Sequence, residues 1–144
     1  MPVKLIGTHQ PEYQQACQLR YRAFFAEHNL PFTILFDQDE TDSFHAVITS
    51  ADCKVVAYGR LTQKLNHDQI SQMVVEPEYQ GRGLGQQILQ FLILLAAQHR
   101  AKLMVLEART SAMEFYQKLG FKPNGSEYSS KKTGIAHIRM TRLP

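Results

Sequence analysis

A chain of 144 residues, of which 44% are hydrophobic and 20% are charged, has the size and composition of one globular domain, which excludes a disordered or fibrous protein. The formal net charge is +3, but the Lys and Arg residues are scattered. We therefore expect no nucleic-acid partner, and the excess positive charge suits an anionic cofactor.

The cysteines and the apolar segments bear on the compartment. Cys17 and Cys53 form no metal-binding or redox motif, so we expect no metal site. The longest apolar run, residues 91–97, is too short to span a bilayer, and the first residues do not resemble a signal peptide. These features predict a cytoplasmic protein without a membrane partner.

Segments with strand-like and helix-like patterns alternate along the chain, which favours a mixed α/β layer architecture. In chain order we expect a strand at 3–6, a helix at 12–27, strands at 44–49, 54–61 and 69–75, a helix at 83–99, a strand at 102–108, a helix at 111–119 and a strand at 135–140. The strands from 44 to 75 predict antiparallel pairing. The strand-helix-strand unit from 69 to 108 predicts parallel pairing.

A glycine-rich loop joins an apolar strand to the long amphipathic helix. Gly81, Gly83 and Gly85 alternate there, and glycine lets the backbone turn sharply and approach a ligand closely. The first amides of a helix have no partners within it, and the helix dipole favours an anion at that end. The loop therefore predicts a pyrophosphate site, with Arg82 adding positive charge at its rim.

The spacing of the loop excludes two common phosphate-binding motifs. A P-loop needs G-x-x-x-x-G-K-[ST], which is absent. A dinucleotide-binding fingerprint has its third glycine one residue later and an acidic residue at the end of a strand about 20 residues further on. This sequence has neither feature. The pattern that fits is Q-x-x-G-x-G, formed by Gln80, Gly83 and Gly85.

Residues 74–85, which read VVEPEYQGRGLG, resemble the acetyl-CoA signature of the GNAT superfamily of N-acetyltransferases. Residues 112–121, AMEFYQKLGF, are similar to a later helix of that family. The resemblance covers nearly the whole chain in the order of its elements. It implies a single GNAT domain over residues 1–144, of α/β (α+β) class, with a mixed, mostly antiparallel sheet of about six or seven strands flanked by about four helices.

A narrower set of residues resembles the ElaA-like branch of bacterial GNAT proteins. The residues that carry this likeness are Leu19, Arg20, Phe24, Glu27, Pro31, His45 and the segment 134–138. The chain departs from that branch at His28 and at Arg109, where the branch often has Gln, so we carry no substrate over from it.

By this resemblance the pantetheine arm of acetyl-CoA enters a gap between strands 69–75 and 102–108. The backbones of Met73 and Val75 would pair with the arm, and the amides of 81–86 would hold the pyrophosphate. The expected cofactor-binding residues are Met73, Val74, Val75, Gln80, Gly81, Arg82, Gly83, Leu84, Gly85, Gln86, Arg109 and Ser111. Arg109 replaces an Asn of the family and has three open interpretations: contact with the cofactor, with an anionic substrate, or with solvent.

The resemblance implies that Tyr116 is the catalytic acid. A phenol with a pKa of about 10 can donate a proton or a hydrogen bond to a departing thiolate whose pKa is about 8.5. The alternative is that Tyr116 only packs beside Phe115 in the core.

The base that deprotonates the amine is open. Some family members have a glutamate at the position of Gln69, which cannot take a proton. The substrate-side candidates are Glu27, His45, Glu107 and His137, and transfer through ordered water is an equal alternative. Each of these side chains could instead be a structural hydrogen-bond partner.

The implied reaction moves the acetyl group of acetyl-CoA to a primary amine of a small molecule or peptide. The alternative is an acyl-CoA-binding sensor without transferase activity, and a homodimer is possible. An acidic stretch, Asp37, Asp39, Glu40 and Asp42, predicts a solvated loop. If this loop lined the acceptor cleft, it would favour a cationic amine.

Overall fold

A computed structural model describes residues 1–144 and contains one eight-stranded sheet and three α-helices. The strands are β1 (Val3–Ile6), β2 (Phe44–Thr49), β3 (Val55–Gln63), β4 (Asp68–Val75), β5 (Met104–Arg109), β6 (Lys122–Pro123), β7 (Tyr128–Ser129) and β8 (Ala136–Arg142). The α-helices are α1 (Pro11–Phe24), α2 (Leu84–Gln98) and α3 (Met113–Gln117). Short 3-10 helices are η1 (Ala26–His28), η2 (Phe32–Leu35), η3 (Pro77–Tyr79) and η4 (Thr110–Ala112).

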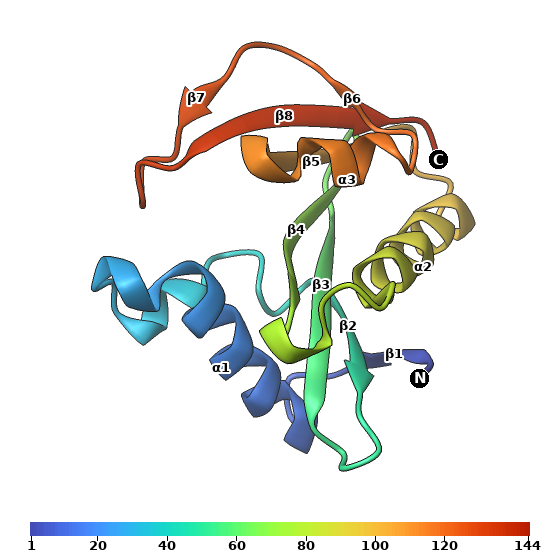
Figure 1. Cartoon of the computed structure of the whole chain (residues 1–144). Coiled ribbons are helices and arrows are strands. Elements are labelled where there is room, and N and C mark those ends of the chain that lie inside the picture. Colours follow the sequence, from blue (N-terminus) through green and yellow to red (C-terminus); the bar gives the residue numbers. More distant parts are fainter.

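The sheet has the order β1-β2-β3-β4-β5-β8-β6, and β7 also pairs with β8. Every pair is antiparallel except β4 with β5. This confirms the predicted mixed, mostly antiparallel architecture, with eight strands in place of six or seven and three α-helices in place of four. Figure 1 shows β5 to β8 at the top of the molecule, with the half that contains β1 to β4 extending below.

The two long helices lie on either side of β2, β3 and β4, α1 to the left and α2 to the right in Figure 1. The predicted apolar face of α2 is confirmed, because Leu84, Ile88, Leu92 and Leu95 are buried in the main hydrophobic core. Helix α1 contributes Ala16 and Leu19 to a smaller core on the other side. Burial of these side chains anchors both helices to the strands that form the site.

Strands β4 and β5 are paired over only a short distance and then diverge. Their parallel register runs from Asp68 with Met104 to Ile70 with Leu106 and stops there. On its other side β4 has a bulge, where Gln72 adopts a φ of 54° and the register with β3 shifts. A bulge bends its strand and interrupts pairing. The predicted gap between these strands therefore starts at this bulge.

Gly59 of β3 lies opposite the bulge and has no room for a side chain. A Cβ atom there would lie 2.5 Å from Cγ2 of Ile88 and 2.7 Å from the sulfur of Met73. The absent side chain lets α2 pack directly on the sheet behind the bulge. Gly59 thus fixes the distance between α2 and β4.

Several boundaries differ from the predicted ones for local reasons. The helix predicted at 12–27 ends at Phe24 and continues as η1, which Asn29 terminates in the left-handed conformation with a φ of 56°. The helix predicted at 111–119 is divided into η4 and α3. Strands β6 and β7 have two residues each, too few to produce a periodic pattern, and were not predicted.

Candidate active site

The loop before α2 presents a row of backbone amides without acceptors. Gly81 and Gly83 have positive φ angles of 80° and 81°, and α2 begins at Leu84. The first helical hydrogen bond is donated by Gln87 to the carbonyl of Gly83, and no amide from 81 to 86 donates to a protein atom. These amides lie at the positive end of the α2 dipole. The loop therefore has the geometry and the polarity of a pyrophosphate site.

The end of β4 is tied to this loop. The side-chain amide of Gln80 donates to the carbonyl of Val75 at 3.1 Å. The amide of Glu76 donates to the carbonyl of Val56 in β3. Since polar groups alternate along an antiparallel strand, those of Val75 point away from β3, toward the side from which β5 has diverged. The amide of Val75 is therefore placed to pair with an extended ligand in the gap.

A cavity of about 510 Å³ opens where β4 and β5 diverge. Its walls come from the bulge of β4, the second half of β5, the last residues of α1, α3 and the segment from β7 to β8. The cavity brings together Met73, Glu107, Arg109, Tyr116 and His137 from the predicted set. Elements far apart in the sequence thus contribute to one pocket beside the amide loop.

Tyr116 extends from α3 into this cavity. Its ring packs edge-on against Phe115 at 5.0 Å and Phe121 at 6.1 Å between centroids. The helix ends in a Schellman motif, with Gly120 at a φ of 90°, in which the Phe121 amide donates to the Tyr116 carbonyl. The Tyr116 hydroxyl itself has no protein partner, and burial raises its pKa to about 12. The phenol therefore stays protonated at neutral pH and is free to donate.

Two of the candidate bases, Glu107 and His137, line the cavity, and they differ in whether they have an atom free to accept a proton. Both oxygens of Glu107 are occupied, one by the Tyr128 hydroxyl at 2.5 Å and the other by Nε of Arg139 at 2.9 Å. Nδ1 of His137 lies 2.8 Å from the carbonyl of Ile135. Because a carbonyl can only accept, Nδ1 carries the hydrogen, and Nε2 has no protein partner. His137 is thus the candidate with a free basic nitrogen.

The other two candidates lie outside the cavity. Glu27 is exposed, and one of its carboxylate oxygens lies 3.8 Å from Nε2 of His28. His45 is 2% exposed, and both of its ring nitrogens are occupied. Nε2 donates to the carbonyl of Glu40, and Nδ1 accepts from the Tyr58 hydroxyl. Burial lowers the pKa of His45, so its ring is neutral and serves as a structural partner.

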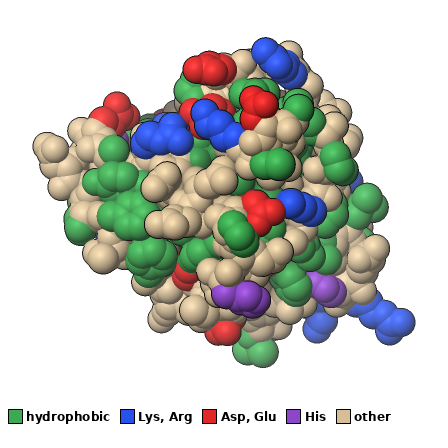
Figure 2. Space-filling model, turned by 90° about the horizontal axis from the view of Figure 1, so that it is seen from below, with side chains coloured by type: hydrophobic (Ala, Val, Ile, Leu, Met, Phe, Trp, Pro, Cys, Tyr) green, Lys and Arg blue, Asp and Glu red, His purple; other side chains and the backbone are tan.

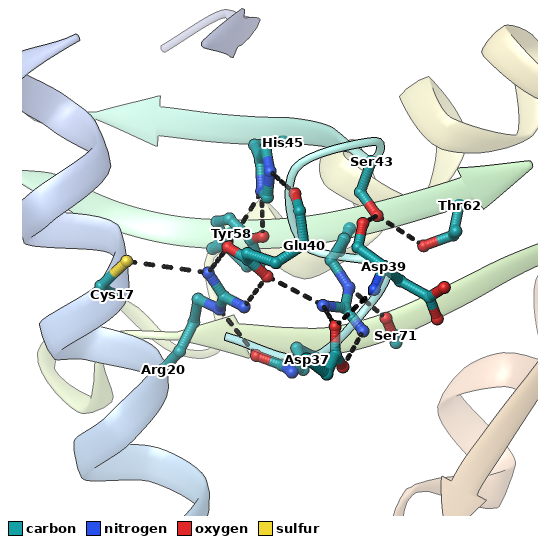
Figure 3. A network of polar contacts seen from close by, with 12 residues as sticks. Cys17, Arg20, Asp37, Asp39, Glu40, Ser43, His45, Tyr58, Thr62 and Ser71 are labelled. Atoms are coloured by element: carbon teal, nitrogen blue, oxygen red, sulfur yellow. Dashed lines mark hydrogen bonds and ion pairs between the residues drawn. The ribbon is translucent and has the colours of Figure 1, made fainter. Parts of the chain in front are cut away.

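His45 belongs to a buried polar network, shown in Figure 3, whose centre is Glu40. The Glu40 carboxylate accepts from Arg20 at 2.7 and 2.8 Å, from Arg60 at 2.8 Å and from the Tyr13 hydroxyl at 2.6 Å. Burial alone would raise the pKa of Glu40, but the hydrogen bonds and charge of Arg20 outweigh it and hold that pKa well below its usual range. The carboxylate is therefore ionised and fully bonded.

This network corrects the expectation of a solvated acidic loop for Asp37, Asp39 and Glu40, whereas Asp42 is exposed as expected. Asp37 binds both terminal nitrogens of Arg60 at 3.1 Å, and Asp39 binds Lys64 at 2.7 Å. Of the acidic stretch, only Asp37 reaches the cavity, and its charge is already paired. The loop therefore gives the cavity no free negative charge.

The network also supports the bulge, a role that sequence reasoning missed. Nε of Arg20 donates to Gln72 at 2.6 Å, and Nε of Arg60 donates to Ser71 at 2.9 Å. Gln72 and Ser71 both line the cavity. The available signal was Arg20, which follows Leu19 on the buried face of α1. A buried charge requires a partner, so an arginine at this position indicates a buried polar network.

The remaining predicted cofactor residues lie in different places. Arg109 lines the cavity, with its guanidinium carbon 5.3 Å from the centre of the Phe24 ring. Ser111 is exposed and lies outside it. Arg82 stacks on Tyr79 at 4.9 Å, at the rim of the amide loop.

A larger cavity of about 890 Å³ lies along the outer face of α1 and contains none of the predicted site residues. Phe32 and Phe36 line it and are exposed. Figure 2 shows hydrophobic side chains gathered at the left end of the lower face, the end where Figure 1 places η1 and η2. This cavity lacks the unpaired Tyr116 hydroxyl that lines the cavity between β4 and β5.

Comparison with known proteins agrees with this geometry. Residues 21–143 match the family model described as an acetyltransferase (GNAT) domain. The match, the free amides and the diverging strands define a protein that transfers an acyl group from CoA. The chain belongs to the GNAT acetyltransferase family and is an acetyltransferase.

Relatives of the chain match it over almost its full length. The chain is 28% identical to the uncharacterized N-acetyltransferase YjcF of Bacillus subtilis over 138 residues, covering 96% of the chain and 97% of YjcF. It is 29% identical to protein ElaA of Escherichia coli over 129 residues, covering 87% of the chain and 83% of ElaA. The crystal structure of Escherichia coli ElaA superposes with a TM-score of 0.84, covering 99% of both chains.

An aminoglycoside 6'-N-acetyltransferase complexed with coenzyme A has the same fold, with a TM-score of 0.78 over 99% of this chain and 97% of that one. At 14% identity, this likeness shows the fold alone. None of the helices in the structure has the length and apolar composition needed to cross a bilayer.

Proposed function

We propose that the chain transfers the acetyl group of acetyl-CoA to a primary amine of a small molecule or peptide. One observation carries the proposal: the amides at 81–86, which follow β4, and the hydroxyl of Tyr116, which lines the cavity where β4 and β5 diverge, all lack protein partners. Such groups fit an anionic, extended cosubstrate that ends in a reactive sulfur. Acetyl-CoA supplies a thioester that is already activated toward an amine.

The residues of the chain divide the work of binding. The amides of Gly81 to Gln86 hold the pyrophosphate, with Arg82 at the rim. The backbones of Met73 and Val75 bind the pantetheine arm in the gap, and Gln80 fixes the loop to the end of β4. Holding the two reactants in one cavity supplies much of the rate, because it replaces an encounter in solution.

Tyr116 and His137 are the acid-base groups in this proposal. The Tyr116 hydroxyl, whose pKa is raised to about 12 by burial, keeps its proton and stabilises the departing thiolate by donating a hydrogen bond to it. Nε2 of His137 takes the proton that the amine loses, while the bond from Nδ1 to the Ile135 carbonyl orients the ring. Glu107, with both oxygens bonded, orients Tyr128 and Arg139.

The proposal is tested by detecting free thiol from acetyl-CoA with a panel of amines. Tyr116→Phe is expected to lower kcat about 100-fold and to leave the Kd for CoA unchanged, since it removes only a hydroxyl. Tyr21→Phe, outside this cavity, is the matched control. Binding of CoA by calorimetry without thiol release for any amine would favour an acyl-CoA sensor, and full activity of Tyr116→Phe would remove the assigned acid.

A further inference from the structure

The charged side chains that line the cavity between β4 and β5 differ in whether they have a partner. Asp37 is paired with Arg60, with both of its oxygens in contact at 3.1 Å. Glu107 is paired with Arg139 at 2.9 Å. The protein therefore already neutralises every carboxylate that lines this cavity.

Arg109, Lys131 and Lys132 also line the cavity, and none of them forms an ion pair. Arg109 comes from the end of β5, and the lysines come from the segment between β7 and β8. The uncompensated charge of the cavity is thus positive, the opposite of what an acidic acceptor cleft would provide.

Two of these cations lie over neighbouring aromatic rings that line the cavity. The guanidinium of Arg109 lies 5.3 Å from the centre of the Phe24 ring, and the ammonium of Lys132 lies 5.9 Å from that of Phe25. The two rings are neighbours, 6.2 Å apart between centroids. Cation–π contacts hold each charge over an apolar surface without neutralising it. Two unpaired cations that line the same cavity favour the binding of an anion there.

We propose that the acceptor amine also carries an anionic group, a carboxylate or a phosphate, which Arg109 and Lys132 bind and Lys131 attracts. The inference rests on the proposed transfer function and names the acceptor class of that site. An arginine fork matches the oxygens of either group, and a lysine adds a point charge. A polycationic amine would be repelled from the same place.

The phosphates of CoA have a separate site. The amides of 81–86 at the start of α2 do not line this cavity, and Arg82 stands beside them. Arg109, Lys131 and Lys132 therefore remain free for the acceptor. This separation predicts that one set of residues determines the preference for a charged acceptor and another set determines the affinity for CoA.

The experiment compares amines in pairs in which one member carries an anionic group and the other does not. One pair is γ-aminobutyrate and its amide, and a second is phosphoethanolamine and ethanolamine, with spermidine as the cationic amine. The full chain is assayed for thiol release from acetyl-CoA. We expect kcat/KM to be about tenfold or more higher for the anionic member of at least one pair, and lowest for spermidine. The preference should shrink in high salt, because salt screens exposed charges.

The variants test whether these residues set the preference. Arg109→Gln and Lys132→Gln are each expected to lower the anionic-to-neutral ratio of kcat/KM about fivefold to tenfold, and Arg109→Lys should restore part of it. Lys54→Gln removes the same charge in the turn between β2 and β3, outside this cavity, and should keep the ratio of the unmodified protein. The Kd for CoA, measured by calorimetry, should not change in Arg109→Gln.

The outcomes separate the two proposals. Equal rates for the anionic and neutral members would overturn the acceptor class while the transfer function stands. A preference that survives in both Arg109→Gln and Lys132→Gln would overturn the assignment of these residues. Loss of CoA affinity in Arg109→Gln would assign that residue to the cofactor. Absence of thiol release with every amine would remove the transfer function itself.

Discussion

Glu40→Gln tests the buried network that supports the bulge of β4. Glu40 is 3% exposed and accepts hydrogen bonds from Arg20, Arg60 and Tyr13, while Arg20 and Arg60 are 0% and 5% exposed. A glutamine fills nearly the same volume but has no charge and only one acceptor oxygen. The substitution therefore leaves two buried guanidinium groups with Asp37 as their only carboxylate partner.

The magnitude follows from the burial of these groups. Removing one member of a buried ion pair typically costs about 3–5 kcal/mol, because the remaining charge loses its compensation. A domain of this size has a total stability of about 5–15 kcal/mol. Glu40→Gln should therefore lower Tm by about 10 °C. Asp39→Asn, which breaks the half-exposed pair with Lys64, should cost less than about 1 kcal/mol and is the matched control.

The pH dependence of stability gives a second test of the contact between Glu40 and Arg20. The pKa of Glu40 is lowered from 4.5 to about 2 in the folded chain, where Arg20 outweighs the opposing effect of burial. A lowered folded-state pKa contributes stability above the unfolded value, and that stability is lost as the pH falls from about 4.5 to about 2. The unmodified chain should lose this contribution over that range, and Glu40→Gln should lack it.

Urea unfolding followed by circular dichroism measures both effects, at neutral pH and in a series of acid buffers. A change of less than about 1 kcal/mol for Glu40→Gln at neutral pH would refute the account of a network that depends on its charge. So would an acid profile that is the same in the two proteins.

Three further predictions concern the site and its packing. Gly83→Ala, at a φ of 81°, should lower the free energy of unfolding by about 1–2 kcal/mol and weaken acetyl-CoA binding, measured by calorimetry, about tenfold. The control Gly125→Ala, at a φ of 109° in another loop, should keep the affinity for acetyl-CoA. Gly59→Ala would place a Cβ atom 2.5 Å from a side chain of α2 and should cost about 1–3 kcal/mol in urea unfolding; an unchanged midpoint would contradict the packing described. His137→Gln should lower kcat about 100-fold with CoA affinity retained, and His67→Gln, outside the cavity, should keep the rate; equal rates for both would leave deprotonation to solvent.

The fold was largely predictable because its main signals are local. The apolar face of α2, the alternating glycines before it and the apolar strand at β5 each follow from sequence periodicity or spacing. By contrast, the two-residue strands β6 and β7 depend on pairing with β8, which leaves no local pattern.

The acceptor side of the site was less predictable because tertiary pairing decides its charge. The acidic stretch near Asp37 predicted a solvated loop, yet Arg20 and Arg60, distant in sequence, pair with its Glu40 and Asp37. Among the candidate bases, the sequence could not tell His45, enclosed in the network, from His137 at the cavity wall. Such differences depend on hydrogen-bond partners that only the folded chain brings together.

The central claim is transfer of an acetyl group to an amine at the cavity between β4 and β5. The direct measurement is mass spectrometry of the amine panel after incubation with acetyl-CoA that carries ¹³C in its acetyl group. The account predicts labelled acetyl on an amine, an equal amount of free CoA, and a large loss of both in Tyr116→Phe. Bound acetyl-CoA with no labelled amine from any member of the panel would contradict it.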